Sequence, residues 1–404
     1  MTKYFLSLSL YRNSNSNKMK TIIGQAATDH FFNKRDKLIL NLWEKLKKGQ
    51  NVLISAPRRI GKTSVMLYMK QNPIKGYQVI YLITESVNNK NEFFRKLVHE
   101  IYAKLNNGNK FTSIMRKLRK STLIKSIGPD GIAFEKKDID YYLELKNIIS
   151  QLDLKDEKLL IMIDEFAQTV ENIMQDENDS NAINFLESNR DIRINPEISK
   201  KIQFIYAGSI GLENIVSHLN SISSINDLLP FPVTPFTEED AKDYILNYAL
   251  QETRFQFQKE QIDYFLKKIE WLNPYFINIL LDEIEDICKE QNQNNITEKI
   301  IDEAFLHALQ KRIYFEHWHT RLRKAYKKES YNFSKEVLNL ASTNTSLNIN
   351  EILNIAVGLG IADNYKDILN SLVYDGYINN IDDVKEYHFN SPLLKMWWNN
   401  NVAN

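Results

Sequence analysis

The feature that most constrains this chain is an apolar run followed by a loop that closes on Gly-Lys-Thr. Residues 51–66 read NVLISAPRRIGKTSVM. The strand-like run NVLIS precedes the loop APRRIG, and Lys62 and Thr63 begin a segment that suits a helix. A loop between a buried strand and a helix directs backbone amides and the positive end of the helix dipole at an anion. The pattern therefore predicts a phosphate-binding loop within an α/β fold.

Residues 56–64 of this segment form the predicted nucleotide site. We expect Lys62 to bridge the outer phosphates of ATP and the Thr63 hydroxyl to bind Mg²⁺. The remaining predicted contacts come from Ala56, Pro57, Arg58, Arg59, Ile60, Gly61 and Ser64. Ala56 stands where the motif G-x-x-x-x-G-K-T has its first glycine, and we expect the loop to tolerate alanine as the mildest replacement. A chance Gly-Lys-Thr in a surface loop is the alternative, which the flanking strand and helix disfavour.

Two carboxylates follow a second buried strand. The segment LLIMIDEF at 159–166 contains Asp164 and Glu165 at its end, and ligands bind at the carboxyl edge of parallel sheets. We expect Asp164 to hold Mg²⁺ through water, and Glu165 to orient and deprotonate the attacking water. Two acids that only cap the next helix are the alternative. Ser209, after the strand IQFIYAG, is a candidate for contact with the γ-phosphate or the water, although a serine also suits a helix start.

Apolar runs separated by amphipathic stretches extend this pattern over residues 21–236. The runs are NVLISA (51–56), QVIYLI (78–83), LLIMID (159–164), IQFIYAG (202–208) and FPVTPF (231–236). Strands that are buried on both faces and separated by helices predict a parallel sheet covered by helices. We therefore expect a P-loop αβα sandwich over 21–236. Residues 1–20 are expected to be a disordered or misassigned extension, with Met1 or Met19 as the true start.

The strand pattern stops after Phe236, and two smaller units are expected to follow. Thr237-Glu238-Glu239-Asp240 spells a capping box that begins a helix, and further helices are predicted near 258–270, 274–291 and 298–313. These helices predict an all-helical lid over 237–312. Three amphipathic helices and a strand-turn-strand, YINNIDDVKEYHF, come next. They predict a winged helix-turn-helix domain over 313–404.

These motifs together resemble the AAA+-related signalling ATPases known as STAND NTPases, and within them the archaeal-type ATPase branch. The resemblance is carried by APRRIGKTS, LLIMIDEF, YAGSIGLENIV and YHFNSPLLKMWW, and it covers about residues 21–404. It implies an ATPase core with strand order 5-1-4-3-2, a helical lid and a winged helix. It also implies that Arg35, within HFFNKRDKLI, lies beside the adenine and ribose. Pro274 would meet the base, although Leu272 stands where the family has the glycine of its Gly-x-Pro motif.

The distribution of arginines bears on the rate of turnover. No arginine lies between Ser209 and Thr253, or at the start of the helix predicted over 274–291. Ring-forming AAA+ proteins carry catalytic or sensing arginines in these places, and such an arginine accelerates phosphoryl transfer about a thousandfold or more. We therefore expect a slow ATPase that acts as a molecular switch. Arg190 and Arg193 are expected to be solvated charges near a helix end rather than catalytic groups.

The predicted winged helix supports a second hypothesis, a DNA-associated ATPase that acts as a loader or a transposition-type helper. Its third helix, NYKDILNSLVYDG, holds one lysine and two aspartates, whereas helices that read the major groove carry several Arg, Lys, Asn or Gln. We therefore favour a protein partner, or self-association, through this domain over DNA. The locally basic stretch at 110–125 is expected to be a solvated helix face rather than a nucleic-acid or partner contact. A module that binds nucleotide without cleaving it is a third hypothesis, which Glu165 disfavours.

Composition limits which partners and which cellular compartment we expect for the protein. Lys plus Arg (52) and Asp plus Glu (51) nearly cancel, so the whole molecule exerts no strong field on nucleic acid or anionic lipid. No apolar run approaches the roughly 20 residues that span a bilayer. The single cysteine, Cys288, is expected to be a buried structural thiol. We expect a cytoplasmic protein that makes no membrane contact.

Overall fold

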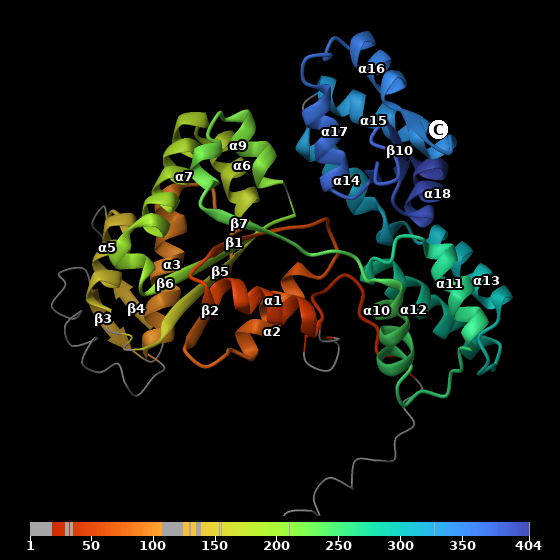
Figure 1. Ribbon diagram of the computed structural model, residues 1–404, viewed down its shortest axis with the longest axis horizontal. Helices are drawn as coiled ribbons and strands as arrows, with labels where there is room; N and C mark the ends of the chain where they lie inside the picture. Colours follow the sequence, from red (N-terminus) through yellow and green to blue (C-terminus); the bar gives the residue numbers. More distant parts are fainter. Residues whose placement is uncertain are drawn as a thin grey trace, which may run out of the picture. The chain divides into compact units, whose positions relative to one another are not determined.

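The protein is described from a computed structural model. The structure describes residues 18–28, 32, 35–106, 124–128, 131–134, 139–152, 154, 156–209, 211–326 and 328–403. Its internal contacts divide the chain into two compact units (Figure 1). The sheet unit spans Lys34–Val233, and the helical unit combines Met1–Asn33 with Thr234–Asn404.

Five strands form the sheet of the sheet unit: β1 (Asn51–Ser55), β2 (Tyr77–Ile83), β5 (Lys158–Asp164), β6 (Ile202–Ala207) and β7 (Leu228–Pro232). Their order is β2-β5-β6-β1-β7, and every pair is parallel. When these strands are numbered one to five along the chain and read from β7 to β2, their order is 5-1-4-3-2, as expected. All of β6 and nearly all of β5 is buried, as strands that are apolar on both faces require in the middle of a covered sheet.

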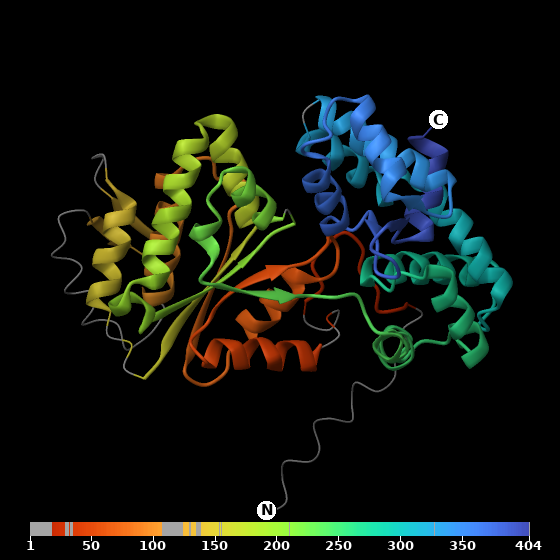
Figure 2. The ribbon, with the colours of Figure 1, turned by 45° about the horizontal axis from the view of Figure 1, so that its top comes forward.

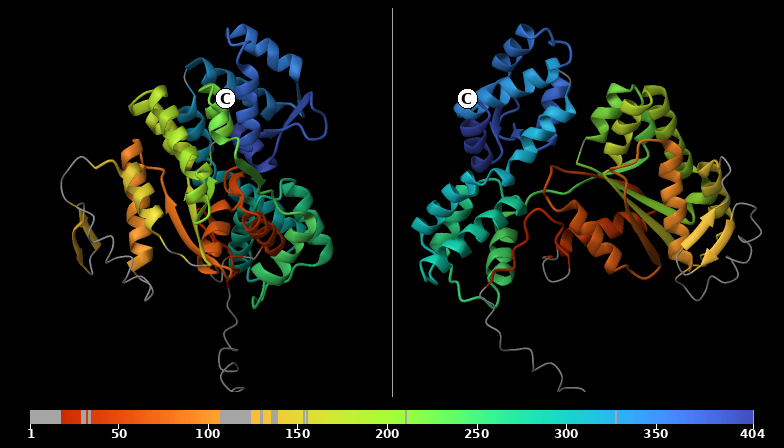
Figure 3. Two further views of the ribbon diagram at one scale, coloured as in Figure 1. Left: turned by 60° about the vertical axis from the view of Figure 1, so that its left-hand side comes forward. Right: turned by 180° about the vertical axis from the view of Figure 1, so that it is seen from behind.

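Helices cover both faces of this sheet (Figures 1 and 2), and the view from behind shows the same two layers (Figure 3). One face carries α1 (Asp36–Lys47) and α2 (Lys62–Gln71). The other carries α3 (Lys90–Asn106), α5 (Tyr141–Gln151), α6 (Phe166–Asp176), α7 (Asp179–Ile194) and α9 (Leu212–His218), and the short α8 (Pro196–Ser199) precedes β6. In the second layer the Phe93 ring lies 5.8 Å from Phe166 and 4.8 Å from Phe185, centroid to centroid. The prediction of a P-loop αβα sandwich is confirmed.

The structure differs from the sequence-based expectation at two places in this unit. β7 lies at Leu228–Pro232 rather than at 231–236, and among the described strands it pairs with β1 alone. Prolines are tolerated there because an edge strand has one side free of ladder hydrogen bonds. β3 (Ile124–Gly128) and β4 (Gly131–Phe134) form an antiparallel pair, which was not among the strands expected from the sequence. Of the expected helix face at 110–125, residues 110–123 lie outside the described part, and the last two belong to β3.

The helical unit begins with the predicted lid. Its helices are α10 (Glu238–Asp243), the π-helix η3 (Tyr244–Ala249), α11 (Lys259–Ile269), α12 (Pro274–Glu290) and α13 (Glu298–Gln310). The capping box between Thr237 and Asp240 is present. The side chains of Asn273 and Thr297 accept hydrogen bonds from backbone amides at the starts of α12 and α13. α10, α12 and α13 therefore each start directly after the cap residue that predicts them, whereas Gln258 before α11 makes no side-chain cap hydrogen bond.

After the short 3-10 helix η4 (Arg312–Tyr314), the described part of the helical unit continues with five α-helices and a small sheet. The helices are α14 (Glu316–Ala325), α15 (Lys328–Thr343), α16 (Ile349–Gly358), α17 (Tyr365–Tyr374) and α18 (Pro392–Asn401). Strands β8 (Leu347–Asn348), β9 (Ile378–Asn379) and β10 (Glu386–Phe389) form an antiparallel sheet in the order β8-β10-β9. From α15 onward the elements run helix, strand, helix, helix, strand, strand, which is the order of a winged helix.

One continuous hydrophobic core runs through the whole helical unit. Buried residues of the helices α10–α13 and of the helices α14–α18 belong to it, and the Trp397 ring of α18 lies 5.6 Å from that of Phe315. Met19 is buried in the same core, and its amide donates a hydrogen bond to Glu285 of α12 at 2.6 Å. Residues 1–17 of the expected extension lie outside the described part. The two regions expected at 237–312 and 313–404 therefore pack as one body.

Cys288 lies on α12 within this core. Its side chain is fully buried, and burial raises the pKa of the thiol to about 11. A thiol with such a pKa is protonated at neutral pH and is a poor nucleophile. The structure thus agrees with the expectation of a buried structural cysteine.

Candidate functional site

The strand order alone brings the predicted site residues to one edge of the sheet. β6 lies between β5 and β1, and all three strands are parallel. The loop after β1, the carboxylates at the end of β5 and Ser209 after β6 therefore share the carboxyl edge. Because β6 is the middle strand, Ser209 follows the strand that separates the phosphate loop from the carboxylates.

The loop between β1 and α2 folds around Lys62. This side chain is only 7% exposed, and its Nζ donates to the carbonyls of Ala56 and Pro57 at 2.8 Å each. Gly61, which precedes α2, has φ 97°, a backbone conformation that favours glycine. Ala56 does not have a positive φ, so the missing first glycine of the motif costs this loop no backbone strain. Arg59 has φ 63°, a left-handed conformation that costs a non-glycine residue on the order of 1 kcal/mol.

Thr63 and Asp164 meet across the edge of the sheet. The Thr63 hydroxyl donates to Asp164 Oδ2 at 2.7 Å, and the Tyr81 hydroxyl donates to the same oxygen at 2.9 Å. Asp164 is 3% exposed. Burial raises the pKa of its carboxyl, and the hydrogen bonds from Thr63 and Tyr81 together with the charge of Lys62 oppose that rise. A hydroxyl and a carboxylate are the hard oxygen donors that Mg²⁺ prefers, so these residues fit the expected ion.

Glu165 is held by Ser209. Its Oε2 accepts hydrogen bonds from the Ser209 amide at 3.0 Å and from the Ser209 hydroxyl at 2.9 Å. The guanidinium of Arg58, from the phosphate loop, lies 3.3 Å from the same hydroxyl oxygen. Glu165 has φ 58°, so the chain turns sharply between the end of β5 and the start of α6. Arg58, Ser209 and Glu165 therefore form a connected series from the loop to the second carboxylate.

Comparisons with solved structures agree with the fold that carries these residues. The fold is similar to that of a Walker-type ATPase from Pyrococcus abyssi, with a TM-score of 0.61 and 13% identity, covering 94% of this chain and 99% of that one. It is also similar to that of the Orc2 protein from Aeropyrum pernix, solved as ADPNP and ADP complexes, with a TM-score of 0.52 and 11% identity over 90% and 92% of the two chains. The chain has a P-loop ATPase fold. No protein-family model and no curated protein sequence matches it.

Within this P-loop ATPase fold, Arg193 is not a solvated charge, and that expectation was wrong. Its side chain is 1% exposed and pairs with Asp227 through two bonds of 2.7 and 2.8 Å. A third bond reaches the carbonyl of Ser224 at 2.6 Å. Buried arginines satisfied in this way tie elements together, and the removal of one partner costs roughly 3–5 kcal/mol. Arg193 therefore links α7 to the segment before β7. Arg190 lies on α7 and is partly buried.

Two further predicted residues lie apart from this cluster in the chain. Arg35 directly precedes α1 in the sheet unit. Pro274 is the first residue of α12 in the helical unit. Their contacts with the base and ribose of a nucleotide stay predictions.

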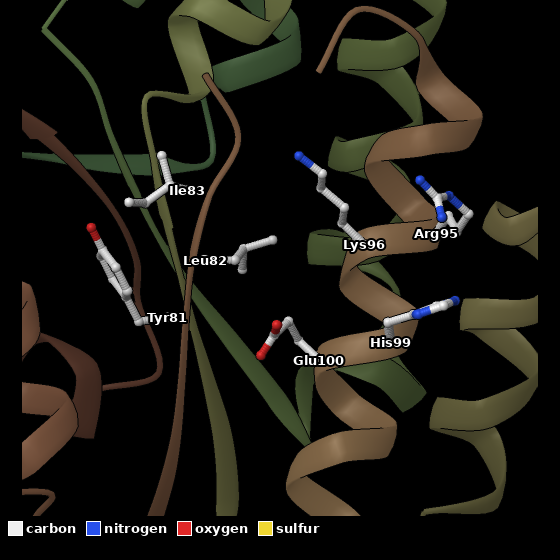
Figure 4. A pocket seen from close by; sticks show the side chains of 7 residues that line it. All are labelled: Tyr81, Leu82, Ile83, Arg95, Lys96, His99 and Glu100. Atoms are coloured by element: carbon white, nitrogen blue, oxygen red, sulfur yellow. The ribbon is translucent and has the colours of Figure 1, made fainter. Parts of the chain in front are cut away.

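A pocket of about 420 Å³ lies between the edge strand β2 and α3. Its lining residues are Tyr81, Leu82, Ile83, Arg95, Lys96, His99 and Glu100. Figure 4 shows that Arg95 and His99 point away from β2, whereas Glu100 lies toward it. The charged groups of this pocket therefore do not converge on one point as they would in an anion site.

None of the helices in the described part of the chain is long and apolar enough to cross a bilayer.

Proposed function

We propose that this chain is an AAA+-related ATPase of the STAND kind, a molecular switch that binds Mg·ATP at residues 56–64 and hydrolyses it slowly. The observation that carries the proposal is the 2.7 Å hydrogen bond between Thr63 and Asp164. It joins the end of the phosphate loop to the end of β5, where Glu165 follows directly. A site that only binds nucleotide needs no second carboxylate at this edge, so Glu165 favours hydrolysis over binding alone.

Each residue of the site has a role in this proposal. Lys62 exchanges its bonds to the loop carbonyls for bonds to the outer phosphates. Thr63 and Asp164 hold Mg²⁺, which neutralises charge on the transferring phosphoryl group. Glu165 accepts a proton from the attacking water. Ser209 fixes the direction of the Glu165 carboxylate through its amide and hydroxyl.

Arg58 is the loop residue that supplies positive charge beside this carboxylate. Its contact with Ser209 places a guanidinium of the same chain next to the groups that handle the water. Charge of this sign stabilises the transition state of phosphoryl transfer. In this proposal Arg58 takes part of the role that an arginine from a neighbouring subunit has in ring-forming relatives.

The helical unit is the proposed output of the switch. Since the lid and the winged helix share one hydrophobic core, a nucleotide-dependent movement of the lid displaces both together. A protein partner, or a second copy of the chain, would then recognise the displaced winged helix. Cytoplasmic location is part of the same proposal.

Calorimetry and light scattering test this function together. Purified wild-type protein is expected to bind ADP and ATP in the presence of Mg²⁺, because the loop offers a lysine and a helix N-terminus to the phosphates. Size-exclusion chromatography with light scattering is then expected to give different elution or mass with ADP and with a non-hydrolysable ATP analogue. No heat of binding with either nucleotide would refute the site. Binding without any difference between the nucleotide states would refute the switch.

A DNA-associated ATPase is the second candidate, supported by the winged-helix order of elements. The charged residues of the third helix of this region, α17, argue against the DNA-associated candidate. Asp375, one of the two aspartates of the third helix segment, is 4% exposed and pairs with Arg321 at 3.1 Å, so it adds little to the surface charge. Lys366 and Asp367 are the exposed charged residues within α17. No group of cations therefore forms on the described face of this helix for contact with phosphates.

An electrophoretic shift assay separates the two candidates. With duplex DNA at low salt, we expect no retarded species below micromolar protein concentration, and no stimulation of ATP hydrolysis by DNA. The low ionic strength makes the assay sensitive, because electrostatic binding to DNA strengthens as salt falls. A salt-sensitive shift together with DNA-stimulated hydrolysis would favour the DNA-associated ATPase instead.

A further inference from the structure

Tyr81 contacts the buried carboxylate of the site from a strand that carries no motif. β2 pairs with β5 so that Ile83 lies beside Asp164 and Tyr81 lies beside Met162. Side chains two residues apart on a strand point to the same face of the sheet. Tyr81 therefore shares a face with Asp164, the face that carries α2, and Figure 4 shows its ring directed away from α3. Lys70 of α2 lies 5.8 Å from the centre of the ring.

Three donors fix the two oxygens of Asp164. The hydroxyls of Tyr81 and Thr63 both donate to Oδ2, at 2.9 and 2.7 Å. The amide of Glu165 donates to Oδ1 at 3.1 Å. The terminal torsion of an aspartate is otherwise broad, so donors on both oxygens select one orientation of the carboxylate. Removal of the Tyr81 hydroxyl takes away one of the two hydroxyl donors to Oδ2, and the other, Thr63, is itself a proposed ligand of the ion.

We propose that Tyr81 is a positioning residue for Mg²⁺, which acts by orienting the Asp164 carboxylate. This inference rests on the proposed function, since it assigns a further residue to the same site. Residues that hydrogen-bond to the groups around a metal typically change metal affinity by 10–100-fold when they are mutated. The tyrosine hydroxyl supplies such a bond from the strand next to β5, while the ring stays beside α2.

The test is the Mg²⁺ dependence of nucleotide affinity in Tyr81→Phe. Calorimetry of ATP binding at a series of Mg²⁺ concentrations measures the concentration of Mg²⁺ that gives half of its full effect on ATP affinity. For Tyr81→Phe this concentration is expected to be about 10-fold above that of the wild type. In EDTA the two proteins are expected to bind ATP with the same affinity within about twofold, because the Tyr81 hydroxyl donates to Asp164, which is a proposed ligand of the ion and not of the phosphates. A changed Mg²⁺ dependence with an unchanged ATP affinity in EDTA distinguishes a positioning role from a general loss of structure.

Tyr77→Phe is the matched control. Tyr77 lies four residues earlier on the same strand and face, and its hydroxyl donates to Gln203 Oε1 at 2.9 Å, away from the carboxyl edge. Its removal is expected to leave the Mg²⁺ dependence unchanged. Equal Mg²⁺ dependence in Tyr81→Phe and wild type would overturn the inference, as would an equal loss of ATP affinity with and without Mg²⁺. If wild-type protein binds no ATP at all, the proposed function fails as well.

Discussion

Replacement of Lys62 by alanine is expected to weaken ATP binding by about 100-fold or more. Lys62 is nearly buried at the base of the loop and already bonds two carbonyls there, so its ammonium group is held where a phosphate would arrive. A charge-assisted bond in such a place is among the strongest that a side chain makes. Calorimetry with ATP and Mg²⁺ measures the effect directly.

The control for this variant removes a lysine of the same unit that lies outside the loop. Lys75 is exposed between α2 and β2, and Lys75→Ala is expected to bind ATP like the wild type. Because Lys62→Ala also leaves two loop carbonyls without their donor, its thermal unfolding should be recorded beside that of the wild type. If folded Lys62→Ala protein binds ATP with wild-type affinity, the loop at residues 56–64 is not the nucleotide site.

Glu165→Gln is expected to slow ATP hydrolysis by 10²–10⁴-fold, the usual contribution of a general base, while ATP still binds. Glutamine keeps the shape of the side chain, and its carbonyl oxygen can accept the two hydrogen bonds that Ser209 donates to Glu165. The change therefore removes the proton acceptor without removing the local structure. Single-turnover phosphate release and calorimetry separate hydrolysis from binding.

Glu177→Gln is the corresponding control. Glu177 is exposed at the opposite end of the helix that Glu165 precedes, and its neutralisation is expected to leave hydrolysis unchanged. If Glu165→Gln releases phosphate at the wild-type rate, Glu165 is not the base. The chain would then match the third hypothesis, a module that binds nucleotide, provided that the wild-type rate is no faster than the uncatalysed reaction.

Much of the sheet unit could be predicted because its signals are local. NVLIS, LLIMID and IQFIYA are short runs that are apolar at nearly every position, and such runs become central strands wherever helices cover both faces. Their ends carry the polar residues of the site, so the meeting of Thr63 with Asp164 follows once the order of strands is known. The order itself came from the family resemblance, since local periodicity does not define which strands are neighbours.

The residues that were missed depend on neighbours that are distant in sequence. Tyr81 lies in an ordinary apolar strand, and only the register of β2 against β5 brings its hydroxyl to Asp164. Arg193 was expected to be a solvated charge near a helix end, because nothing close to it in the sequence indicates a partner. Its partner Asp227 lies 34 residues later in the chain. For the antiparallel pair β3–β4 a signal was present, because the sequence Gly-Pro-Asp-Gly joins its two strands and is typical of a turn.

The two segments that make up the helical unit have a mechanical consequence. The sheet unit is continuous in sequence, whereas the helical unit takes residues from before it and after it. Met19 and Lys20 bond to Glu285 and Ala249 within the helical unit, so the ATPase fold is an insertion that is tethered at both of its ends. A domain held by one linker can swivel freely, but one held by two must bend both connectors together. In the proposed switch, both chain connections between the two units would therefore have to change together.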